Sequence, residues 1–391
     1  MKKEIHIAII DSGINREIFS QITGKQISGY CICNGNCVPV IKDACAMKHG
    51  TICSTIVAEF SENAKFTNIS VFNEEGDSSI ENFCIALDWC AKNSVDVISM
   101  STGLADWFEF KEMELYIKKL KEMGVVIVAA CSNRNVITYP ASLPEVIGVK
   151  YRDCPELTGG EYFFVSKPKD GIDIETSMPE SKSIDTLRNS YGLGSGISNS
   201  LVTPYIAGLI SNMIAEKNEQ INIEGVRDML LANSLEKKHI SLSINNYDKN
   251  EEVEIPIVTV VCDNKHQFAT LDFSKRLLEC FQIEGYSAAL LLFNEKADFY
   301  KNLFQIEKND IQKQVLYYSQ KLRLDIAFIC ASLDDFSKEL RSISDCVLIS
   351  QKGKNEHDDA KTLTLSEMQN GEFDLLSTYN MVLNKFEIEE M

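Results

Sequence analysis

Short apolar runs of strand length alternate with longer segments of helical periodicity along most of this chain. Residues 4–10 predict a buried strand, and residues 51–60 place apolar side chains at helical spacing. Strands that alternate with helices pair in parallel, because each helix returns the chain to the end of the sheet where the previous strand began. The pattern therefore predicts an α/β fold, with a parallel sheet covered by helices on both faces.

The same alternation divides the chain in two. Further strands are predicted at 69–72, 95–100, 125–130 and within 139–149, further helices at 79–93, 110–123, 201–214 and 223–233, and loops with edge strands over 151–195. Residues 237–252 are polar and charged, so we place the domain boundary there. The predicted organisation is a first domain at 1–238, a linker at 239–252 and a smaller α/β domain at 253–391.

The second domain repeats the alternation on a smaller scale. Strands are predicted at 255–262, 288–293, 326–331 and 346–350, and helices at 270–284, between 296 and 322, at 334–343 and at 374–384. Its first strand leads to Asp263-Asn-Lys-His-Gln. A phosphate-binding loop needs glycines and a Gly-Lys-Ser/Thr ending at this point, so the sequence does not support nucleotide binding.

Composition narrows the class of protein. The net charge of −18 argues against a nucleic-acid partner. No stretch approaches the roughly 20 apolar residues that span a bilayer, so no membrane partner is expected. The first residues hold no apolar run of signal-peptide length, and the thirteen cysteines are odd in number and scattered. A cytoplasmic protein with reduced thiols is therefore predicted.

Four cysteines lie close together in the sequence: Cys31, Cys33, Cys37 and Cys45. Their spacing, C-x-C-x3-C-x7-C, differs from the paired C-x2-C arrangement of most zinc sites. Free thiols near a Gly/Asn turn are the favoured interpretation, and a metal site is the alternative. No cofactor is predicted.

The stretch 196–208, Gly-Ile-Ser-Asn-Ser-Leu-Val-Thr-Pro-Tyr-Ile-Ala-Gly, runs from turn-forming residues into an apolar helix. A serine in the first turn of a helix lies near unpaired backbone N–H groups and the positive end of the helix dipole. Ser200 is thus well placed to be a nucleophile that later carries an oxyanion. The same position also suits an ordinary N-cap, and for this segment alone the N-cap is the better interpretation.

Two further side chains have the chemistry to serve such a serine. Asp11 follows the first predicted strand, at the end where α/β proteins place reactive groups, although for this residue alone an Asx turn is the better interpretation. His49 begins a helix beside Gly50 and is the best placed of the five histidines to be a general base.

Together these residues resemble the subtilisin-like serine peptidases over residues 1 to about 236. The matching blocks, in the order of the family, are Asp11-Ser12-Gly13, His49-Gly50-Thr51, 96–103 ending in Ser101-Thr102-Gly103, the strand at 125–130 followed by Asn133, Tyr139-Pro140-Ala141, and Ser200-Leu-Val-Thr-Pro204 followed by Ile206-Ala207-Gly208. The second domain carries no recognised resemblance.

The resemblance implies a role for each residue. Ser200 would attack the scissile carbonyl, His49 would move its proton, and Asp11 would orient the imidazole. Asn133 and the Ser200 backbone N–H would hold the oxyanion. The substrate peptide would bind along Ser101, Thr102 and Gly103 and against Ala130, Cys131 and Ser132.

The chain departs from the family at several places. Ser198-Asn199 stands where the family has Gly-Thr, and a glycine would allow a positive φ or a close approach. Cys131-Ser132 replaces Ala-Gly, which is expected to narrow the pocket. The long calcium-binding loop after the histidine helix is absent, so no metal of that kind is predicted.

Three functions follow from these observations. The first is an intracellular serine endopeptidase that works through an acyl-enzyme. The second is a pseudopeptidase that binds an extended peptide without cutting it. In the third, the domain at 253–391 docks one precursor peptide, which the first domain then matures.

Overall fold

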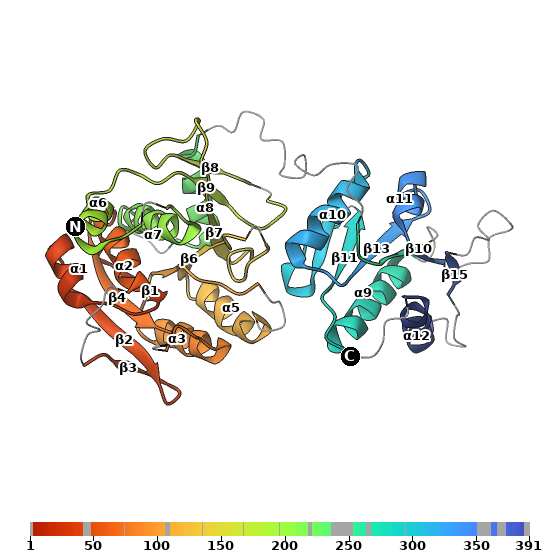
Figure 1. The fold of residues 1–391 in the computed structure, drawn as a ribbon, viewed down its shortest axis with the longest axis horizontal. Coiled ribbons are helices and arrows are strands. Elements are labelled where there is room, and N and C mark those ends of the chain that lie inside the picture. The colour runs from red at the N-terminus through yellow and green to blue at the C-terminus, as the bar shows by residue number, and fades with distance from the viewer. Residues whose placement is uncertain are drawn as a thin grey trace. The chain divides into compact units, whose positions relative to one another are not determined.

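The computed structural model of the chain describes residues 3–41, 48–73, 75–105, 110–134, 136–166, 168–194, 196–217, 221–235, 253–262, 267–293, 295–349, 361–365 and 373–386. The chain separates into two compact units, residues 1–238 and residues 239–391. Each unit is built on its own sheet (Figure 1).

The first unit contains a nine-stranded sheet in the order β3-β2-β4-β1-β5-β6-β7-β9-β8. The strands are β1 (Ile5–Asp11), β2 (Ile27–Cys33), β3 (Asn36–Pro39), β4 (Ala64–Ser70), β5 (Val97–Met100), β6 (Val126–Ala130), β7 (Val146–Tyr151), β8 (Tyr162–Phe164) and β9 (Ile174–Thr176). Only the outer pairs, β2–β3 and β8–β9, are antiparallel. The seven strands β2, β4, β1, β5, β6, β7 and β9 run in one direction, so their carboxyl ends share one edge of the sheet.

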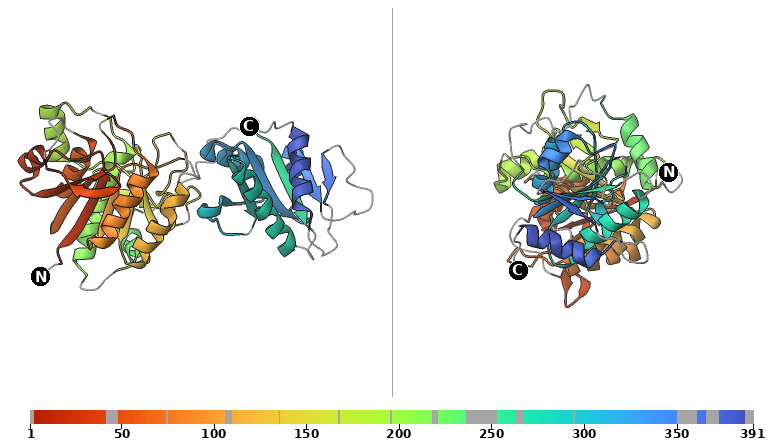
Figure 2. Two further views of the ribbon diagram at one scale, coloured as in Figure 1. Left: turned by 90° about the horizontal axis from the view of Figure 1, so that it is seen from below. Right: turned by 90° about the vertical axis from the view of Figure 1, so that its right-hand side faces the viewer.

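Helices cover both faces of this sheet (Figure 2). One face carries α2 (His49–Glu59) and α7 (Asn199–Ala215), which also pack on each other, and the other carries α3 (Ile80–Lys92) and α5 (Glu114–Glu122). The remaining elements are α1 (Arg16–Thr23), η1 (Lys111–Met113), α6 (Lys182–Tyr191) and α8 (Ile223–Ala232). The predicted α/β class, with a mostly parallel sheet and helices on both faces, is confirmed.

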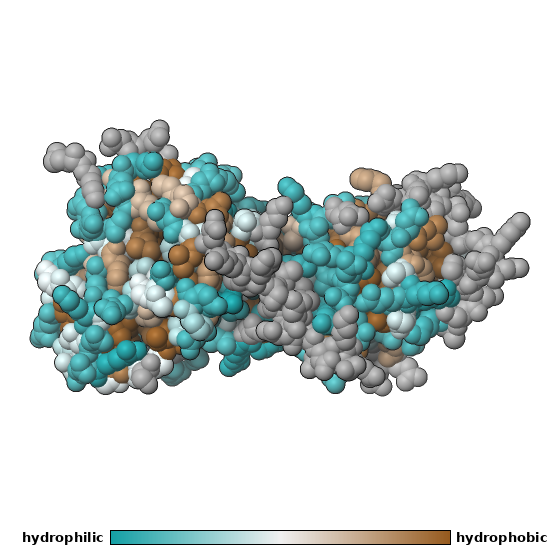
Figure 3. All heavy atoms as spheres, turned by 90° about the horizontal axis from the view of Figure 1, so that it is seen from above, coloured by the Kyte–Doolittle hydropathy of each residue, from teal (hydrophilic) through white to brown (hydrophobic). Residues whose placement is uncertain are grey.

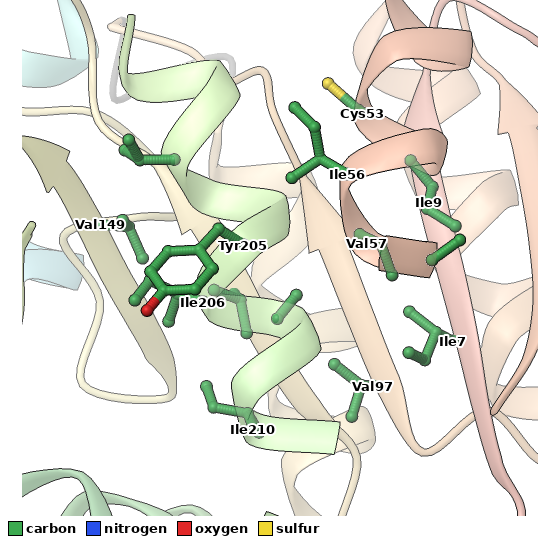
Figure 4. Packing of buried hydrophobic residues seen from close by; sticks show 14 of the residues in the cluster. Ile7, Ile9, Cys53, Ile56, Val57, Val97, Val149, Tyr205, Ile206 and Ile210 are labelled. Carbon is green, nitrogen blue, oxygen red and sulfur yellow. The ribbon is translucent and has the colours of Figure 1, made fainter. Parts of the chain in front are cut away.

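The core lies where α2 and α7 meet the sheet. Every residue of β1 is buried, and so is every residue of α2 from Gly50 to Ala58. A helix that is buried on nearly all sides belongs to a protein interior. Figure 4 shows side chains of β1, α2 and α7 filling this layer, among them Ile9, Val57 and Ile206. Each aliphatic side chain removed from water contributes about 1.5–3 kcal/mol, so this layer fixes both helices on the sheet.

Two predictions for the first unit were wrong in part. The strand expected at 69–72 begins at Ala64, because β4 pairs with β1 along its whole length despite its polar residues. One of these, Asn68, is buried and donates to Gly50 O and Ser54 Oγ, so tertiary hydrogen bonds offset its polarity. The region 151–195 also contains α6, which is capped by the Ser181 hydroxyl.

The second unit contains a six-stranded parallel sheet in the order β12-β11-β13-β10-β14-β15. Its strands are β10 (Ile257–Cys262), β11 (Ala288–Phe293), β12 (Leu303–Ile306), β13 (Ile326–Ser332), β14 (Cys346–Ile349) and β15 (Thr362–Thr364). Helices α9 (Gln267–Ile283) and α12 (Leu375–Phe386) pack on each other and α10 (Ile311–Leu322) packs on α11 (Lys338–Ile343), on opposite faces of the sheet in Figure 1.

The span 296–322, predicted as helices, also contains the 3-10 turn η3 (Phe299–Lys301) and the strand β12. Three of the four β12 residues are buried at the edge of the sheet beside β11. Four residues are too few for their periodicity to separate a strand from a helix, which is why the sequence pattern missed it. The predicted linker at 239–252 lies outside the described residues.

On the face drawn in Figure 3, hydrophobic residues of the first unit reach the surface in separate patches among hydrophilic ones. Scattered apolar side chains of this kind are ordinary on a protein surface. Within the described parts of the chain, no helix combines the length and the hydrophobicity needed to cross a bilayer.

Candidate active site

Three polar residues that are far apart in the sequence meet at the carboxyl edge of the first sheet. Asp11 is the last residue of β1, His49 is the first residue of α2, and Ser200 lies in the first turn of α7. Parallel sheets place reactive groups at this edge because the strands end there and the helices on their faces begin there. The parallel topology thus brings together residues separated by 38 and 151 positions.

The three side chains form a continuous hydrogen-bonded chain. His49 Nδ1 lies 2.9 Å from Asp11 Oδ1 and 3.0 Å from Asp11 Oδ2, and His49 Nε2 lies 3.1 Å from Ser200 Oγ. Asp11 is almost fully buried, whereas the His49 side chain is 41% exposed. A carboxylate that accepts from Nδ1 leaves Nε2 as the acceptor of the serine proton, as a general base must be.

The turn after β1 holds the carboxylate and the imidazole together. The backbone N–H of Ser12 donates to Asp11 Oδ1 at 2.6 Å, and the backbone N–H of Gly50 donates to Ser12 Oγ at 3.1 Å. A Cβ on Gly50 would lie only 2.4 Å from the carbonyl oxygen of Gly13. Position 50 therefore requires glycine, because only glycine lets α2 begin this close to the end of β1.

The charge on His49 is set by its neighbours. The pKa of the imidazole is raised above its ordinary value: Cys53 is the largest cause, the hydrogen bond and charge of Asp11 add to it, and burial opposes it. Burial also raises the pKa of the Cys53 thiol, whose Sγ lies 3.6 Å from His49 Nδ1. The buried Asp11 carboxylate also stabilises the imidazolium.

Ser198 and Asn199 stand where the family pattern has Gly-Thr, and the backbone conformation at these two positions does not require glycine. Ser198 is the N-cap of α7 with φ −131°, an extended conformation open to any residue, and Asn199 is helical. Asn199 is buried, and its side chain amide donates to Cys131 O at 3.0 Å and Ser132 O at 3.1 Å. Its Oδ1 accepts from the backbone N–H of Tyr151 at 2.7 Å. This asparagine ties the start of α7 to the segment after β6.

Asn133 lies on that same segment. Its Oδ1 accepts from the backbone N–H of Asn199 at 3.1 Å, so its amide nitrogen is the atom left to donate. In the first turn of α7 the backbone N–H of Ser200 is one of the donors without an intrahelical acceptor. The site therefore offers two donors from different elements, held to each other through Asn199.

A pocket of about 200 Å³ opens beside Ser200. It is lined by Ser101, Thr102, Gly103, Ala105, Ala130, Cys131, Ser132, Asn133, Thr138 and Ser200. All six residues expected to contact substrate are in this lining, together with Asn133 and Ser200. Ala105 and Thr138 were not expected. The bridge between Leu104 and Tyr139, with N–H···O distances of 2.8 and 2.7 Å, brings Thr138 to the pocket.

Thr138 joins the two walls of the pocket. Its Oγ1 accepts from the backbone N–H of Ser132 at 2.8 Å. Its methyl group packs against Gly103, where a Cβ would lie only 2.7 Å from the methyl carbon. Position 103 is thus a close approach that requires glycine. The Ser101 hydroxyl is buried without a hydrogen-bond partner among the described residues. No lining residue carries a charge.

The other histidine that the structure describes, His6, lies away from this site. His6 is buried and contacts Thr67 Oγ1 and Asn93 O, and burial lowers its pKa. His239, His266 and His357 lie outside the described residues, as does Cys45.

The described cysteines of the cluster lie in the β2–β3 hairpin. Cys31 is paired with Val38 and Cys33 with Asn36, whereas Cys37 is paired with Ile32. Side chains alternate between the faces of a strand, so Cys31 and Cys33 face one side and Cys37 the other. Within the described residues, only Asp11, His49 and Cys53 bring three His, Cys, Asp or Glu ligand atoms within 4.8 Å of one another.

The chain is similar in sequence to a known protein family and to several of its members. The Subtilase family matches residues 2–254, more than half of the chain. Subtilisin DY from Bacillus licheniformis is 25% identical over 247 residues, 58% of this chain and 82% of that protein. Subtilisin amylosacchariticus from Bacillus subtilis subsp. amylosacchariticus is 24% identical over 181 residues, 44% of each chain. The chain thus spans less than half the length of the second relative.

A crystal structure of a cold adapted subtilisin-like serine proteinase is also similar, with 19% identity and a TM-score of 0.38 over 58% of this chain and 81% of that one.

Proposed function

This chain belongs to the Subtilase family and is a subtilisin-like serine peptidase by family, and we propose that it cleaves peptide bonds through an acyl-enzyme on Ser200. The observation that carries the proposal is the continuous chain of contacts from Asp11 through His49 to Ser200 Oγ, with distances of 2.9 and 3.1 Å. Both distances are within the range in which a general base can accept a proton without rearrangement.

The first half of the reaction forms the acyl-enzyme. Ser200 Oγ bonds to the scissile carbonyl carbon while its proton moves to His49 Nε2. Asp11 orients the imidazole and stabilises the imidazolium that forms. The C–N bond then breaks, and the proton on Nε2 leaves with the amine.

The second half returns the enzyme to its resting state. A water oxygen bonds to the acyl carbon and gives its proton to His49 Nε2, and the C–Oγ bond breaks as Oγ takes that proton back. In both halves the carbonyl oxygen carries negative charge. The Asn133 amide nitrogen and the Ser200 backbone N–H are the donors proposed to stabilise it.

The substrate is a peptide or protein. We propose that it binds in extended form along Ser101, Thr102 and Gly103, with one side chain in the pocket beside Ser200. Charged side chains lose hydration in such a pocket and find no counter-charge in its lining, so an uncharged residue is favoured there. A peptide library analysed by mass spectrometry, with Ser200→Ala as control, tests this preference.

The alternative function is a peptide-binding pseudopeptidase. A fluorophosphonate probe separates the two functions, because it labels a serine only where a base activates it. Labelling that disappears in Ser200→Ala supports the peptidase. A folded chain that binds peptides but takes up no probe would establish the pseudopeptidase instead.

We further propose that the protein acts in the cytoplasm and matures a precursor peptide docked by the second unit. The eleven described free cysteines support a reducing compartment, since several are buried thiols in the cores of both units. The added α/β unit supplies a surface beyond the peptidase fold. Removal of residues 253–391 should slow cleavage of the natural precursor but not of a short peptide, and equal rates on both would contradict the docking role.

A further inference from the structure

A second hydroxyl group touches the proposed nucleophile. Ser198 Oγ lies 2.8 Å from Ser200 Oγ, closer than His49 Nε2 at 3.1 Å. Ser198 occupies the N-cap position of α7, where a serine side chain normally accepts from a backbone N–H of the first turn. Ser198 makes no such bond. Other N-cap serines of this chain do, including Ser79 at α3, whose Oγ accepts from Asn82 N.

The proton positions follow from the other contacts of Ser200. His49 Nδ1 lies within 3.0 Å of both oxygens of Asp11, so in the neutral imidazole the proton is on Nδ1 and Nε2 is an acceptor. Ser200 has one hydroxyl proton, and it points to Nε2 when the enzyme is ready to react. In that state Ser200 Oγ can only accept from Ser198, which is therefore the donor.

A donor on Ser200 Oγ matters most when that oxygen leaves. When the acyl-enzyme is hydrolysed, the C–Oγ bond breaks and its electron pair moves to Oγ, which takes the proton held on His49 Nε2. A hydrogen bond to an atom that gains negative charge is stronger in the transition state than before it, and so accelerates the step. During attack the same bond occupies a lone pair of the nucleophile, so its benefit to acylation is smaller.

We propose that Ser198 is a further catalytic residue, which donates a hydrogen bond to Ser200 Oγ and accelerates hydrolysis of the acyl-enzyme. This inference rests on the proposed peptidase function. The two neighbouring residues then have different roles. Asn199 binds the segment that carries Asn133, and Ser198 donates to the Ser200 oxygen that leaves the acyl group.

Steady-state and burst kinetics with a chromogenic ester test the proposal, because kcat for an ester reports deacylation and kcat/KM reports acylation. Ser198→Ala should lower kcat about tenfold, the order expected for one hydrogen bond to an atom that gains charge. The KM should fall in parallel, so that kcat/KM stays within about twofold. The acyl-enzyme should accumulate and be visible by mass spectrometry.

Matched variants separate the hydroxyl from the backbone. Ser198→Gly, which also lacks the hydroxyl, should behave like Ser198→Ala, and Ser198→Thr, which keeps it, should restore kcat. Ser79→Ala removes a true N-cap bond and should lower the Tm without changing kcat. Ser198→Ala should do the reverse.

The inference is wrong if kcat is unchanged in Ser198→Ala, if kcat/KM falls as much as kcat, or if only one of the two hydroxyl-free variants is slow. Its failure differs from failure of the proposed function. A wild-type chain that takes up no fluorophosphonate and hydrolyses no ester would overturn both, whereas a reactive wild type with an unaffected Ser198→Ala overturns this inference alone.

Discussion

The two units share an architecture, but among the residues that the structure describes only the first carries a hydrogen-bonded Asp, His and Ser at the edge of its sheet. Each has a sheet dominated by parallel strands with helices on both faces. In the first unit, the carboxyl ends of the strands carry the Asp11, His49 and Ser200 chain and a pocket. In the described part of the second unit, Asp335 lies just after β13, where it forms an ion pair with Lys308, which follows β12, and accepts a hydrogen bond from the Ser332 hydroxyl. The layered fold supplies the edge, and particular side chains supply the chemistry.

The largest expected effect tests whether peptide hydrolysis depends on the sheet edge of the first unit alone. Ser200→Ala should lower kcat/KM by at least about 10⁴-fold, the scale known from the loss of a triad residue in a subtilisin. Ser332→Ala at the matching edge of the second unit removes a 2.6 Å hydrogen bond to Asp335 and should leave kcat/KM unchanged. Peptide hydrolysis by the full chain measures both. A large loss in Ser332→Ala would mean that the second unit takes part in the reaction.

A buried amide in each unit gives the next comparison. Asn199 ties Cys131 and Ser132 to α7, and Gln314 in α10 likewise donates to Glu307 O and Asn309 O. Replacing either by alanine removes these hydrogen bonds, at a cost of about 0.5–1.5 kcal/mol each.

Asn199→Ala should lower both kcat and the denaturant midpoint, because the segment that carries Asn133 loses its side-chain hydrogen bonds to α7, with a decrease in kcat of about 10- to 100-fold. Gln314→Ala should lower the midpoint only. Urea unfolding followed alongside ester hydrolysis distinguishes the two. A kcat that survives in Asn199→Ala would refute its positioning role.

The pH profile of activity should reflect the raised pKa of His49. Catalysis requires the neutral imidazole, so kcat/KM should rise as the pH increases and level off only above a pKa that exceeds 6.5. Below that pKa the slope is about tenfold per pH unit. Cys53→Ala removes the largest contribution to the raised pKa of His49 and should move the rise in kcat/KM to lower pH. A wild-type profile that levels off at or below pH 6.5 would contradict this account.

The smallest expected effect is on the pH dependence of stability. One residue in each unit contributes to it, and the two contributions change in opposite directions as the pH rises. The folded-state pKa of His49 is raised, so its contribution is present below pH 6.5 and is lost as the pH rises through the folded value. The folded-state pKa of Asp335 is lowered, because bonds from Lys308 and Ser332 outweigh burial. Its contribution is present above the ordinary Asp pKa and is lost as the pH falls through the folded value.

Thermal melts of the full chain across pH measure both effects. His49→Ala should flatten the alkaline side of the Tm profile, and Asp335→Asn should flatten the acidic side. Variants that flatten the opposite sides would reverse the assignment.

The sequence predicted much of the first unit because its strands and helices are apolar in regular patterns. Where burial depends on tertiary hydrogen bonds the prediction was incomplete, as in β4, where the polar residue Asn68 is buried against α2. Very short strands were missed for a similar reason, since β12 owes its conformation to pairing with β11.

The candidate site was predicted as far as motifs reach. Asp11, His49 and Ser200 occur in recognisable blocks, and the structure brings them together. Thr138 was missed because a bridge between Leu104 and Tyr139 carries it to the pocket, and no sequence spacing encodes that contact. Ser198 and Asn199 were identified only as departures from a family pattern. Their contacts depend on the side-chain directions at the start of α7.

At the junction of β1 and α2 there is no room for a side chain at Gly50, because a Cβ would lie 2.4 Å from the Gly13 carbonyl oxygen. A side chain at this position would push the start of α2 away from the Gly13 carbonyl oxygen and so lengthen the contact between His49 and the carboxylate. Substrates and inhibitors therefore meet a histidine whose backbone is placed by the packing of α2 against β1. Engineering for new substrates should change residues that line the pocket and keep Gly50 at the junction of β1 and α2.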